Sequence, residues 1–330
     1  MKTIAYIVPY FGSFPNLFPL WLNNCRYNPT VDWFVFTDDK RVFNYPENVH
    51  VYYMSFEEMK QLVQGRFEYN IWLERPYKLC DFKIAYGDIF RDYLKGYDFW
   101  GFCDIDMIWG DIRHFLTDDI LNRYDKIGHR GHSTLIKNSE FYNNIYKTGL
   151  RDGTTYRKIA ISPDNCYSDE LYFNRLFKEL NIPSYDETIF ANLSTLYPNF
   201  RLTHLSSSER TKNKRMIFTS NVGKLIRLSV VGKKIYRDEF MYIHFLKRRI
   251  IVQVPPETES FLIVPNEIIP YYEVQYKDIL DYSRYNMITF LWERFRLNAH
   301  KITWKNFLPI VAKKLGAYYR LSFNKNRIYG

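Results

Sequence analysis

Apolar residues in the first part of the chain alternate between short unbroken runs and helical spacing. The runs at 3–11, 33–39 and 49–55 are rich in β-branched and aromatic residues, which is typical of buried strands. Segment 16–28 lies between the first two runs and spaces its apolar residues by one helical turn: Leu17, Leu20, Trp21 and Cys25. We therefore expect strand, helix and strand in succession, which opens an α/β domain with a parallel sheet.

The next part of the chain continues this pattern and places two acids at the end of a strand. Segment 77–94 has the apolar spacing of an amphipathic helix. Segment 98–106 has the composition of a buried strand and ends in Asp104 and Asp106. A further strand, containing Gly and His, is expected within 126–138.

The pattern becomes less regular in the second half of the chain. A helix is expected over 168–180, where Ser168 is a favourable N-cap. From 201 to 234 the chain is polar and basic, and strand character returns in 241–254. Segment 255–270 is rich in Pro and Glu, which predicts a connector.

Composition limits the class of protein. The 330 residues are 46% hydrophobic and 25% charged, which indicates a globular protein of one large domain or two. Four widely spaced cysteines without a CxxC pair favour a reducing compartment, so we expect the cytoplasm and no glycan on the Asn192-Leu193-Ser194 sequon. The N-terminal apolar run is too short for a signal peptide, and without a run of about 18 apolar residues no transmembrane helix is expected.

Positive charge is concentrated at the C-terminal end. The net charge is +10, and from Glu293 to Gly330 nine Lys or Arg residues stand against one acid. Apolar residues recur there at helical spacing, at 304, 307, 308, 311, 315 and 318. This pattern predicts basic amphipathic helices on an anionic membrane surface, and a helix packed on the rest of the protein is the alternative. Nucleic acid is not an expected partner, because no recognisable module accompanies the charge.

The two acids after segment 98–103 need a partner, since buried carboxylates without one are costly. Asp104 and Asp106 stand two residues apart, so a strand end directs both to the same side. Carboxylates in this arrangement suit a hard divalent cation, Mg²⁺ or Mn²⁺, and Mn²⁺ also accepts an imidazole. A cation held by two or three protein ligands keeps open positions that a diphosphate can fill.

The stretch FCDIDMIWGDI, residues 102–112, resembles the Asp-x-Asp element of metal-dependent glycosyltransferases with the GT-A fold, distantly of the family-eight type. The resemblance implies a Rossmann-like α/β fold with a mainly parallel central sheet flanked by helices. It implies a catalytic domain over 1–254, with a nucleotide-sugar half to about residue 112 and an acceptor half from 113. Residues 255–330 would form the C-terminal extension with basic amphipathic helices.

Three further segments match the family in the same order along the chain. RPYKLCDFKIAYGDIF resembles the helix that carries a basic residue toward the donor, which implies Lys83 first and Lys78 second. SDELYFNRLF resembles the helix start with the catalytic or acceptor-positioning acid, which implies Asp169 and Glu170. YIHFLKRR resembles the element whose histidine completes the metal site and whose lysine contacts the diphosphate; the implied residues are His244 and Lys247. The family's glycine after the histidine and its Lys-Pro-Trp ending are absent here.

The resemblance also implies a donor-binding edge and a sugar-binding region. The nucleotide base would lie at the end of the first strand, beside Pro9, Tyr10 and Phe11, and acids after the second strand would accept hydrogen bonds from uracil or ribose: Asp38 and Asp39. His129 and His132 lie where the family binds donor sugar and acceptor.

Each of these residues also has a structural interpretation. Lys83 could be a solvated helix residue, Asp169 and Glu170 a favourable first turn, and His244 a structural histidine; acids after a strand, such as Asp38 and Asp39, are also common in turns.

The expected function is transfer of a sugar from a nucleotide-diphosphate donor, with UDP-sugar favoured, to a glycan or lipid-linked glycan in cell-surface polysaccharide synthesis of the capsule or O-antigen type. The expected location is the cytoplasm, including the inner face of the cell membrane. Retention of configuration is slightly favoured. A metal-dependent nucleotidyl- or phosphotransferase is the alternative enzyme, but it would need a Gly- and basic-rich phosphate loop near residue 10, where VPYFGSFP has one glycine. A non-catalytic carbohydrate- or membrane-surface binding protein is the alternative from another class.

Overall fold

The alternation of strand and helix at the start of the chain folds as the sequence predicts. The computed structural model describes residues 1–203, 212–246, 248–285 and 288. Four parallel strands stand in the order β3-β2-β1-β4: β3 (Val49–Tyr53), β2 (Val31–Thr37), β1 (Ile4–Pro9) and β4 (Phe99–Cys103). These strands are apolar on both faces because helices cover both faces of the sheet.

Alternate residues of β1 show how the two faces are filled. Ala5 and Ile7 belong to a core formed with η1 (Pro76–Ala85), α2 (Phe56–Gln64) and α8 (Leu171–Glu179). On the opposite face Tyr6 and its neighbours pack on three other helices: α1 (Phe18–Arg26), α4 (Ile112–Phe115) and α5 (Asp118–Arg123). Short helices complete the first face: α3 (Tyr86–Ile89), α6 (Glu140–Asn144), η2 (Ile145–Lys147) and α7 (Tyr156–Ala160). The mixed α/β class expected from the sequence is therefore confirmed.

The other half of this sheet differs from the prediction. Segment 126–138 is an antiparallel hairpin of β6 (Lys126–Arg130) and β7 (Ser133–Lys137) and not one strand, so the order continues β4-β7-β6-β8, with β8 at Ser184–Tyr185. The register between β6 and β7 shifts where Gly128 has a φ of +88°, a conformation that glycine adopts without steric cost.

Two predicted helices are shorter than expected. Segment 77–94 forms the 3₁₀ helix η1 and the single turn α3. The helix expected over 168–180 is α8, Leu171–Glu179, and its N-cap is Glu170 and not Ser168. Ser168 is buried, and its backbone N–H and hydroxyl donate to the side chain and carbonyl of Asp81, so tertiary bonds take the place of the cap.

A second, mostly antiparallel sheet comes mainly from segments that the sequence pattern left without strands, and only its strand at Ile251–Val252 lies within the expected 241–254. Its order is β12 (Lys234–Phe240), β11 (Lys224–Val231), β10 (Met216–Asn221), β15 (Ser260–Val264), β16 (Glu267–Pro270) and β14 (Ile251–Val252), and α9 (Tyr276–Ser283) packs on it. The connector expected over 255–270 is wrong, because β15 and β16 occupy most of this segment. The two consecutive prolines that suggested a connector lie in the loop before β15. In β11 and β12 charged residues stand among the apolar ones, and Arg227 of β11 is buried in an ion pair with Asp238 of β12, so these strands have a basic composition that does not indicate a sheet.

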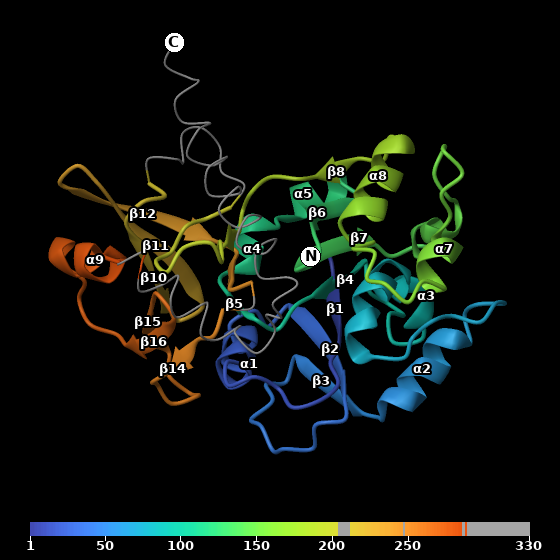
Figure 1. Cartoon of the computed structure of the whole chain (residues 1–330), viewed down its shortest axis with the longest axis horizontal. Helices are drawn as coiled ribbons and strands as arrows, with labels where there is room; N and C mark the ends of the chain where they lie inside the picture. The colour runs from blue at the N-terminus through green and yellow to red at the C-terminus, as the bar shows by residue number, and fades with distance from the viewer. Residues whose placement is uncertain (204–211, 247, 286–287, 289–330) are drawn as a thin grey trace, which may run out of the picture. The chain divides into compact units, whose positions relative to one another are not determined.

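A small third sheet of β5 (Met107–Trp109), β13 (Tyr242–His244) and β9 (Ala191–Asn192) adjoins the end of β4. Figure 1 shows β5 between the seven-stranded sheet with its helices and the six-stranded sheet. These elements all belong to a compact unit, Met1–Ser283, and a second unit comprises Arg284–Gly330. The basic helices expected at 304–318 lie outside the described residues.

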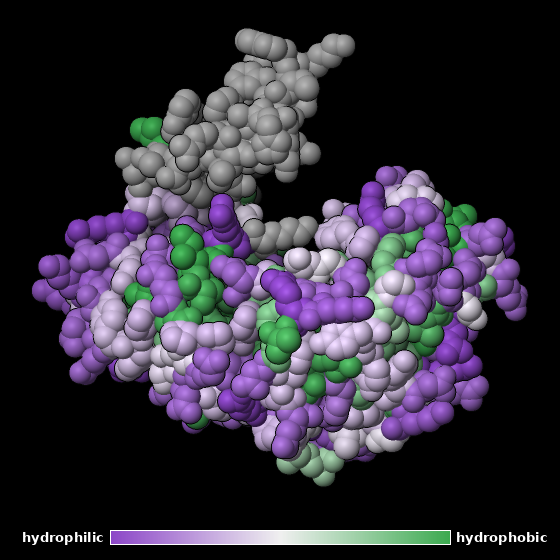
Figure 2. All heavy atoms as spheres, turned by 90° about the horizontal axis from the view of Figure 1, so that it is seen from below, coloured by the Kyte–Doolittle hydropathy of each residue, from purple (hydrophilic) through white to green (hydrophobic). Residues whose placement is uncertain are grey.

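The aromatic residues mostly serve the core. The largest fully buried side chains include Trp21, Trp33, Trp100, Trp109 and several Tyr and Phe residues. On the face shown in Figure 2, hydrophilic side chains predominate and apolar ones gather in separate patches among them. Among the described helices, none combines the length and apolar character that a bilayer span requires.

Candidate metal centre

The two aspartates lie at a corner between two sheets. The chain leaves β4 after Cys103 and enters β5 at Met107, and the Asp104 N–H donates to the carbonyl of His132 while the Asp106 carbonyl accepts from the Phe245 N–H. The side chain of the intervening Ile105 is buried in the core. Backbone hydrogen bonds therefore fix the main chain at both aspartates, while their side chains remain partly exposed, Asp104 by 34% and Asp106 by 31%.

His244 reaches the same corner from β13. This strand pairs antiparallel with β5, so that His244 stands opposite Met107. The histidine is buried, and its Nε2 lies 3.2 Å from Oδ1 of Asp106 and 3.7 Å from Oδ2 of Asp104. One ligand atom from each of the three residues lies within 4.8 Å of the other two. Two carboxylate oxygens and one imidazole nitrogen form a set that Mn²⁺ accepts, so these residues fit a divalent cation.

Lys83 supplies a positive charge beside this cluster. Its Nζ lies 2.7 Å from Oδ1 of Asp104, donates to the Gly131 carbonyl at 2.7 Å, and lies 3.6 Å from Oδ2 of Asp169. Burial alone would lower the pKa of Lys83, but Asp104 and other neighbouring groups outweigh it and hold this pKa well above its ordinary value. Lys83 is thus a buried ammonium between two carboxylates rather than a solvated helix residue.

Asp169 is the buried acid of the site. It follows the loop that ends in Ser168, and burial raises the pKa of its carboxyl to about 6 although Lys83 acts in the opposite direction. Gly131 covers it closely, because a Cβ on Gly131 would lie only 2.3 Å from Oδ2 of Asp169. Glu170, the neighbouring acid, accepts the Gly131 N–H at 3.1 Å and pairs with Arg130 at 3.4 Å. The two acids therefore hold the turn of the β6–β7 hairpin over Lys83.

Lys78, the second basic candidate, has a different environment. It is fully buried, pairs with Asp81 at 2.9 Å, and donates to the carbonyls of Ile159 and Asp164. Asp81 also accepts the backbone N–H groups of Cys166 and Ser168. This buried pair thus fastens the loop that leads to Asp169.

The two histidines of the β6–β7 hairpin have different surroundings. The ring of His132 lies 4.4 Å from that of His244, and its Nδ1 is 2.9 Å from the Tyr242 hydroxyl. Burial, and after it His244, lowers the pKa of His132 well below its ordinary value, so this ring is neutral. His129 lies within β6, with its ring 5.9 Å from that of Phe190.

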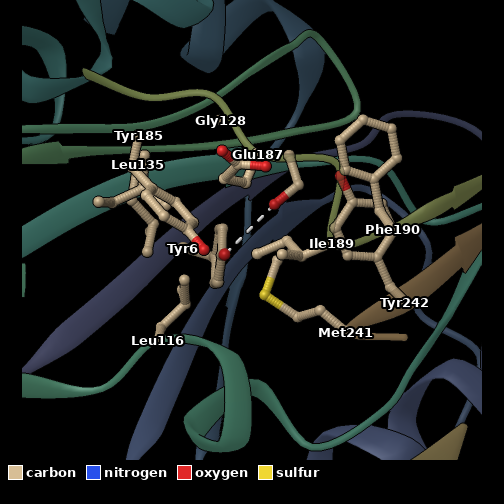
Figure 3. A pocket seen from close by; sticks show the side chains of 12 residues that line it. Tyr6, Leu116, Gly128, Leu135, Tyr185, Glu187, Ile189, Phe190, Met241 and Tyr242 are labelled. Atoms are coloured by element: carbon tan, nitrogen blue, oxygen red, sulfur yellow. Dashed lines mark hydrogen bonds between the residues drawn. The ribbon is translucent and has the colours of Figure 1, made fainter. Parts of the chain in front are cut away.

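A narrow pocket lies behind this histidine pair. Figure 3 shows Phe190 and Tyr242, whose rings stack at 5.4 Å, on one side of it and Tyr6 near its centre. The Tyr6 and Ser133 hydroxyls lie 3.2 Å apart. None of the predicted site residues lines this pocket. Two of its aromatic residues, Phe190 and Tyr242, also pack against the ring of His132, at 5.0 and 5.5 Å between ring centroids.

The predicted base-binding edge lies at the ends of β1 and β2. Burial, and after it the charge of Asp106, raises the pKa of Tyr10, whose hydroxyl donates to the Ser13 carbonyl at 3.4 Å. The carboxylates of Asp38 and Asp39 accept from the Gly12 and Phe14 N–H groups at 2.7 and 2.8 Å. The hydrogen bond from the Arg41 side chain is the main cause that holds the pKa of Asp39 below its ordinary value.

Pro9 ends β1 at this edge, and Phe11 is buried against Phe56. Lys247 lies outside the described residues. The structure thus brings together Asp104, Asp106, His244, Lys83, Asp169, Glu170 and His132, and gives Lys78 separate partners. Sequence patterns missed Gly131, Asp81 and Asn192; Asn192 stands out in the sequence only as the first residue of a sequon.

The fold and the site together define an α/β protein with a carboxylate–imidazole cluster at the corner of its central sheet, suited to a divalent cation. The family of unknown function DUF6625 matches residues 6–272, and the chain belongs to this family. No curated protein matches the chain.

Proposed function

We propose that the protein is a metal-dependent glycosyltransferase with the GT-A fold, using a UDP-sugar as donor. The observation that carries the proposal is the meeting of Asp104, Asp106 and His244, with Lys83 beside them, at the carboxyl end of a parallel strand. Ligands of open α/β sheets bind at such strand ends. The order of these residues along the chain agrees with the family-eight pattern of the sequence.

The charges of the site support binding of a cation and a diphosphate. Four acids stand near one another; Lys83 lies beside Asp104 and Asp169, and Arg130 pairs with Glu170. This concentration of carboxylates favours a divalent cation, held by Asp104, Asp106 and His244. The bound cation would supply the positive charge that stabilises a diphosphate leaving group.

The chain's own residues have distinct roles in this proposal. Lys83 fixes Asp104 through its ion pair and adds a buried positive charge near the leaving group. Asp169, with a pKa of about 6, is mostly ionised at neutral pH. It can accept a proton from the acceptor hydroxyl, which gives inversion, or stabilise the sugar cation from the other face, which gives retention. The resemblance of YIHFLKRR to the family's histidine–lysine element slightly favours retention, and NMR of the product anomer decides between the two outcomes.

The proposed acceptor is a glycan or lipid-linked glycan in cell-surface polysaccharide synthesis. The C-terminal segment, with nine basic residues against one acid, supports a place on an anionic membrane surface at the cytoplasmic face. This location would bring the site to a lipid-linked acceptor.

Calorimetry with UDP in the presence and absence of Mn²⁺ tests the proposal. We expect UDP to bind with Mn²⁺ and to bind far more weakly without it. Absence of metal-dependent UDP binding would refute the proposal, and a screen of UDP-sugars for release of UDP then identifies the donor.

Variants at the aspartates test the site assignment. Asp104→Asn and Asp106→Asn should both abolish turnover. Thermal unfolding without metal should stay nearly unchanged in Asp106→Asn, whereas Asp104→Asn also removes an ion-pair partner of the buried Lys83 and should unfold at a lower temperature. Asp119→Asn is the matched control, because Asp119 is an exposed aspartate in the first turn of α5. Turnover that survives either site substitution would remove that residue from the centre.

A further inference from the structure

The side-chain amide of Asn192 lies directly behind His244. In β9, Asn192 stands opposite His244 of β13, and both residues are buried. The distance between Oδ1 of Asn192 and Nδ1 of His244 is 2.8 Å. The other imidazole nitrogen, Nε2, faces Asp104 and Asp106.

Thr203 sets the orientation of this amide. Its hydroxyl donates to the Asn192 backbone carbonyl at 3.3 Å and so uses its single hydrogen. The same hydroxyl oxygen then accepts from Nδ2 of Asn192 at 2.9 Å. The Thr203 N–H also donates to the Asn192 carbonyl, at 2.9 Å, which keeps the two residues in register. The amide nitrogen therefore faces Thr203, and the amide oxygen faces His244.

This orientation determines which nitrogen of His244 carries the hydrogen. An amide oxygen only accepts hydrogen bonds, so Nδ1 of His244 must be the donor. A ring that binds a cation is neutral, and with Nδ1 as the donor its Nε2 lone pair would face the two carboxylates. The Nε2 lone pair and the nearby carboxylate oxygens repel one another, and a cation held by all three atoms would remove this repulsion.

We infer that Asn192 is a positioning residue for the cation centre, which holds His244 in the tautomer that binds metal through Nε2. This inference rests on the proposed cation site and goes beyond it, because it assigns the selection of that tautomer to Asn192 and Thr203. A flipped amide would present its NH₂ group to Nδ1 and stabilise the opposite tautomer. Nε2–H would then point at the carboxylates and exclude the cation.

The test is the affinity of the full-length protein for Mn²⁺ alone, measured without nucleotide from the electron paramagnetic resonance signal of free Mn²⁺. Asn192→Leu removes the acceptor and should weaken Mn²⁺ binding about 10- to 100-fold, the usual effect of losing such an outer partner. Asn192→Asp keeps an acceptor at the same place and should restore binding to near the wild-type value. Thr203→Val lets the amide flip and should cause a smaller loss in the same direction.

A matched control separates this role from general packing. Asn23 is also a buried asparagine, on α1, and its amide donates to the Thr258 carbonyl. Asn23→Leu should leave the Mn²⁺ affinity unchanged. Wild-type affinity in Asn192→Leu, or an Asn192→Asp variant as weak as Asn192→Leu, would overturn the inference.

The outcomes also distinguish this inference from the proposed function. If the wild-type protein binds Mn²⁺ but not UDP, the glycosyltransferase proposal fails and the role of Asn192 stands on the variant series. If the wild-type protein binds no Mn²⁺, both fail. If Asn192→Leu does not fold, the comparison of Thr203→Val with wild type decides, and equal affinity overturns the inference.

Discussion

Replacing Lys78 with methionine tests whether this lysine serves the donor or the fold. The family resemblance implies donor binding, whereas the structure buries Lys78 completely against Asp81. Methionine keeps much of the apolar length of the side chain and removes the charge. The carboxylate of Asp81 then stays buried without its cation, although the N–H groups of Cys166 and Ser168 still donate to it.

The expected cost follows from this burial. Removing one partner of a buried ion pair costs about 3–5 kcal/mol, because the remaining charge has no compensation. The carbonyls of Ile159 and Asp164 also lose a donor. Since total stability is about 5–15 kcal/mol, the loss is a large fraction of it. In contrast, the UDP affinity of the protein that remains folded should not change.

Urea unfolding measures the cost, and calorimetry at low temperature measures the UDP affinity. Lys60→Met is the control, because Lys60 forms an exposed ion pair with Glu74, worth about 1 kcal/mol or less. A combined Lys78→Met and Asp81→Asn variant should recover part of the loss. A Lys78→Met variant that loses UDP affinity but unfolds like Lys60→Met would show that the structural reasoning is wrong.

Three other predictions concern the acid, the glycine and the basic segment. Asp169 has a folded pKa of about 6 and an unfolded pKa near 3.9, so the stability it contributes is present below about pH 4 and is lost as the pH rises through 6. At pH 8, Asp169→Asn should therefore need more urea to unfold than the wild type, because its free energy of unfolding should be higher by roughly 2–3 kcal/mol. This difference in free energy should shrink toward pH 4, and a difference that stays constant would contradict the reasoning. Gly131→Ala would place a Cβ 2.3 Å from Oδ2 of Asp169 and should lower sugar-nucleotide turnover at least about tenfold, whereas Gly65→Ala, whose Cβ meets only ordinary contacts, should not; equal turnover of the two variants refutes the crowding argument. Truncation after Tyr285 should abolish sedimentation with anionic liposomes, and a truncated protein that still sediments would exclude the membrane role of the basic segment.

The sequence predicted well those parts of the fold where local pattern and tertiary environment agree. Strands β1, β2 and β4 are buried almost throughout, so their apolar runs identify them directly, and the partly exposed edge strand β3 is identified by its β-branched and aromatic residues. Most of the six-stranded sheet was missed because β11 and β12 carry lysines and arginines among their apolar residues, and one of these, Arg227, is itself buried and pairs with Asp238 of the neighbouring strand. Ser168 was misassigned as a cap because Asp81, which bonds to it, is distant in the sequence.

The candidate site divides in the same way. Asp104 and Asp106 are adjacent in sequence, so their spacing alone predicts that they act together. Lys83 and His244 needed the family pattern as well, and the structure brings both to the aspartates. No local sequence signal could reveal Asn192. Its contact with His244 depends on the pairing of β9 with β13, and its contact with Thr203 depends on the path of the chain after β9.

The position of His244 has a consequence for how the protein is made. The aspartates and Lys83 lie in the first third of the chain, whereas His244 follows about 140 residues after Asp106 and arrives only with β13. A nascent chain on the ribosome therefore exposes the carboxylates long before the imidazole that completes the centre. Tight Mn²⁺ binding would then be a property of finished molecules, and a chain arrested before β13 would compete poorly for the cell's pool of that metal.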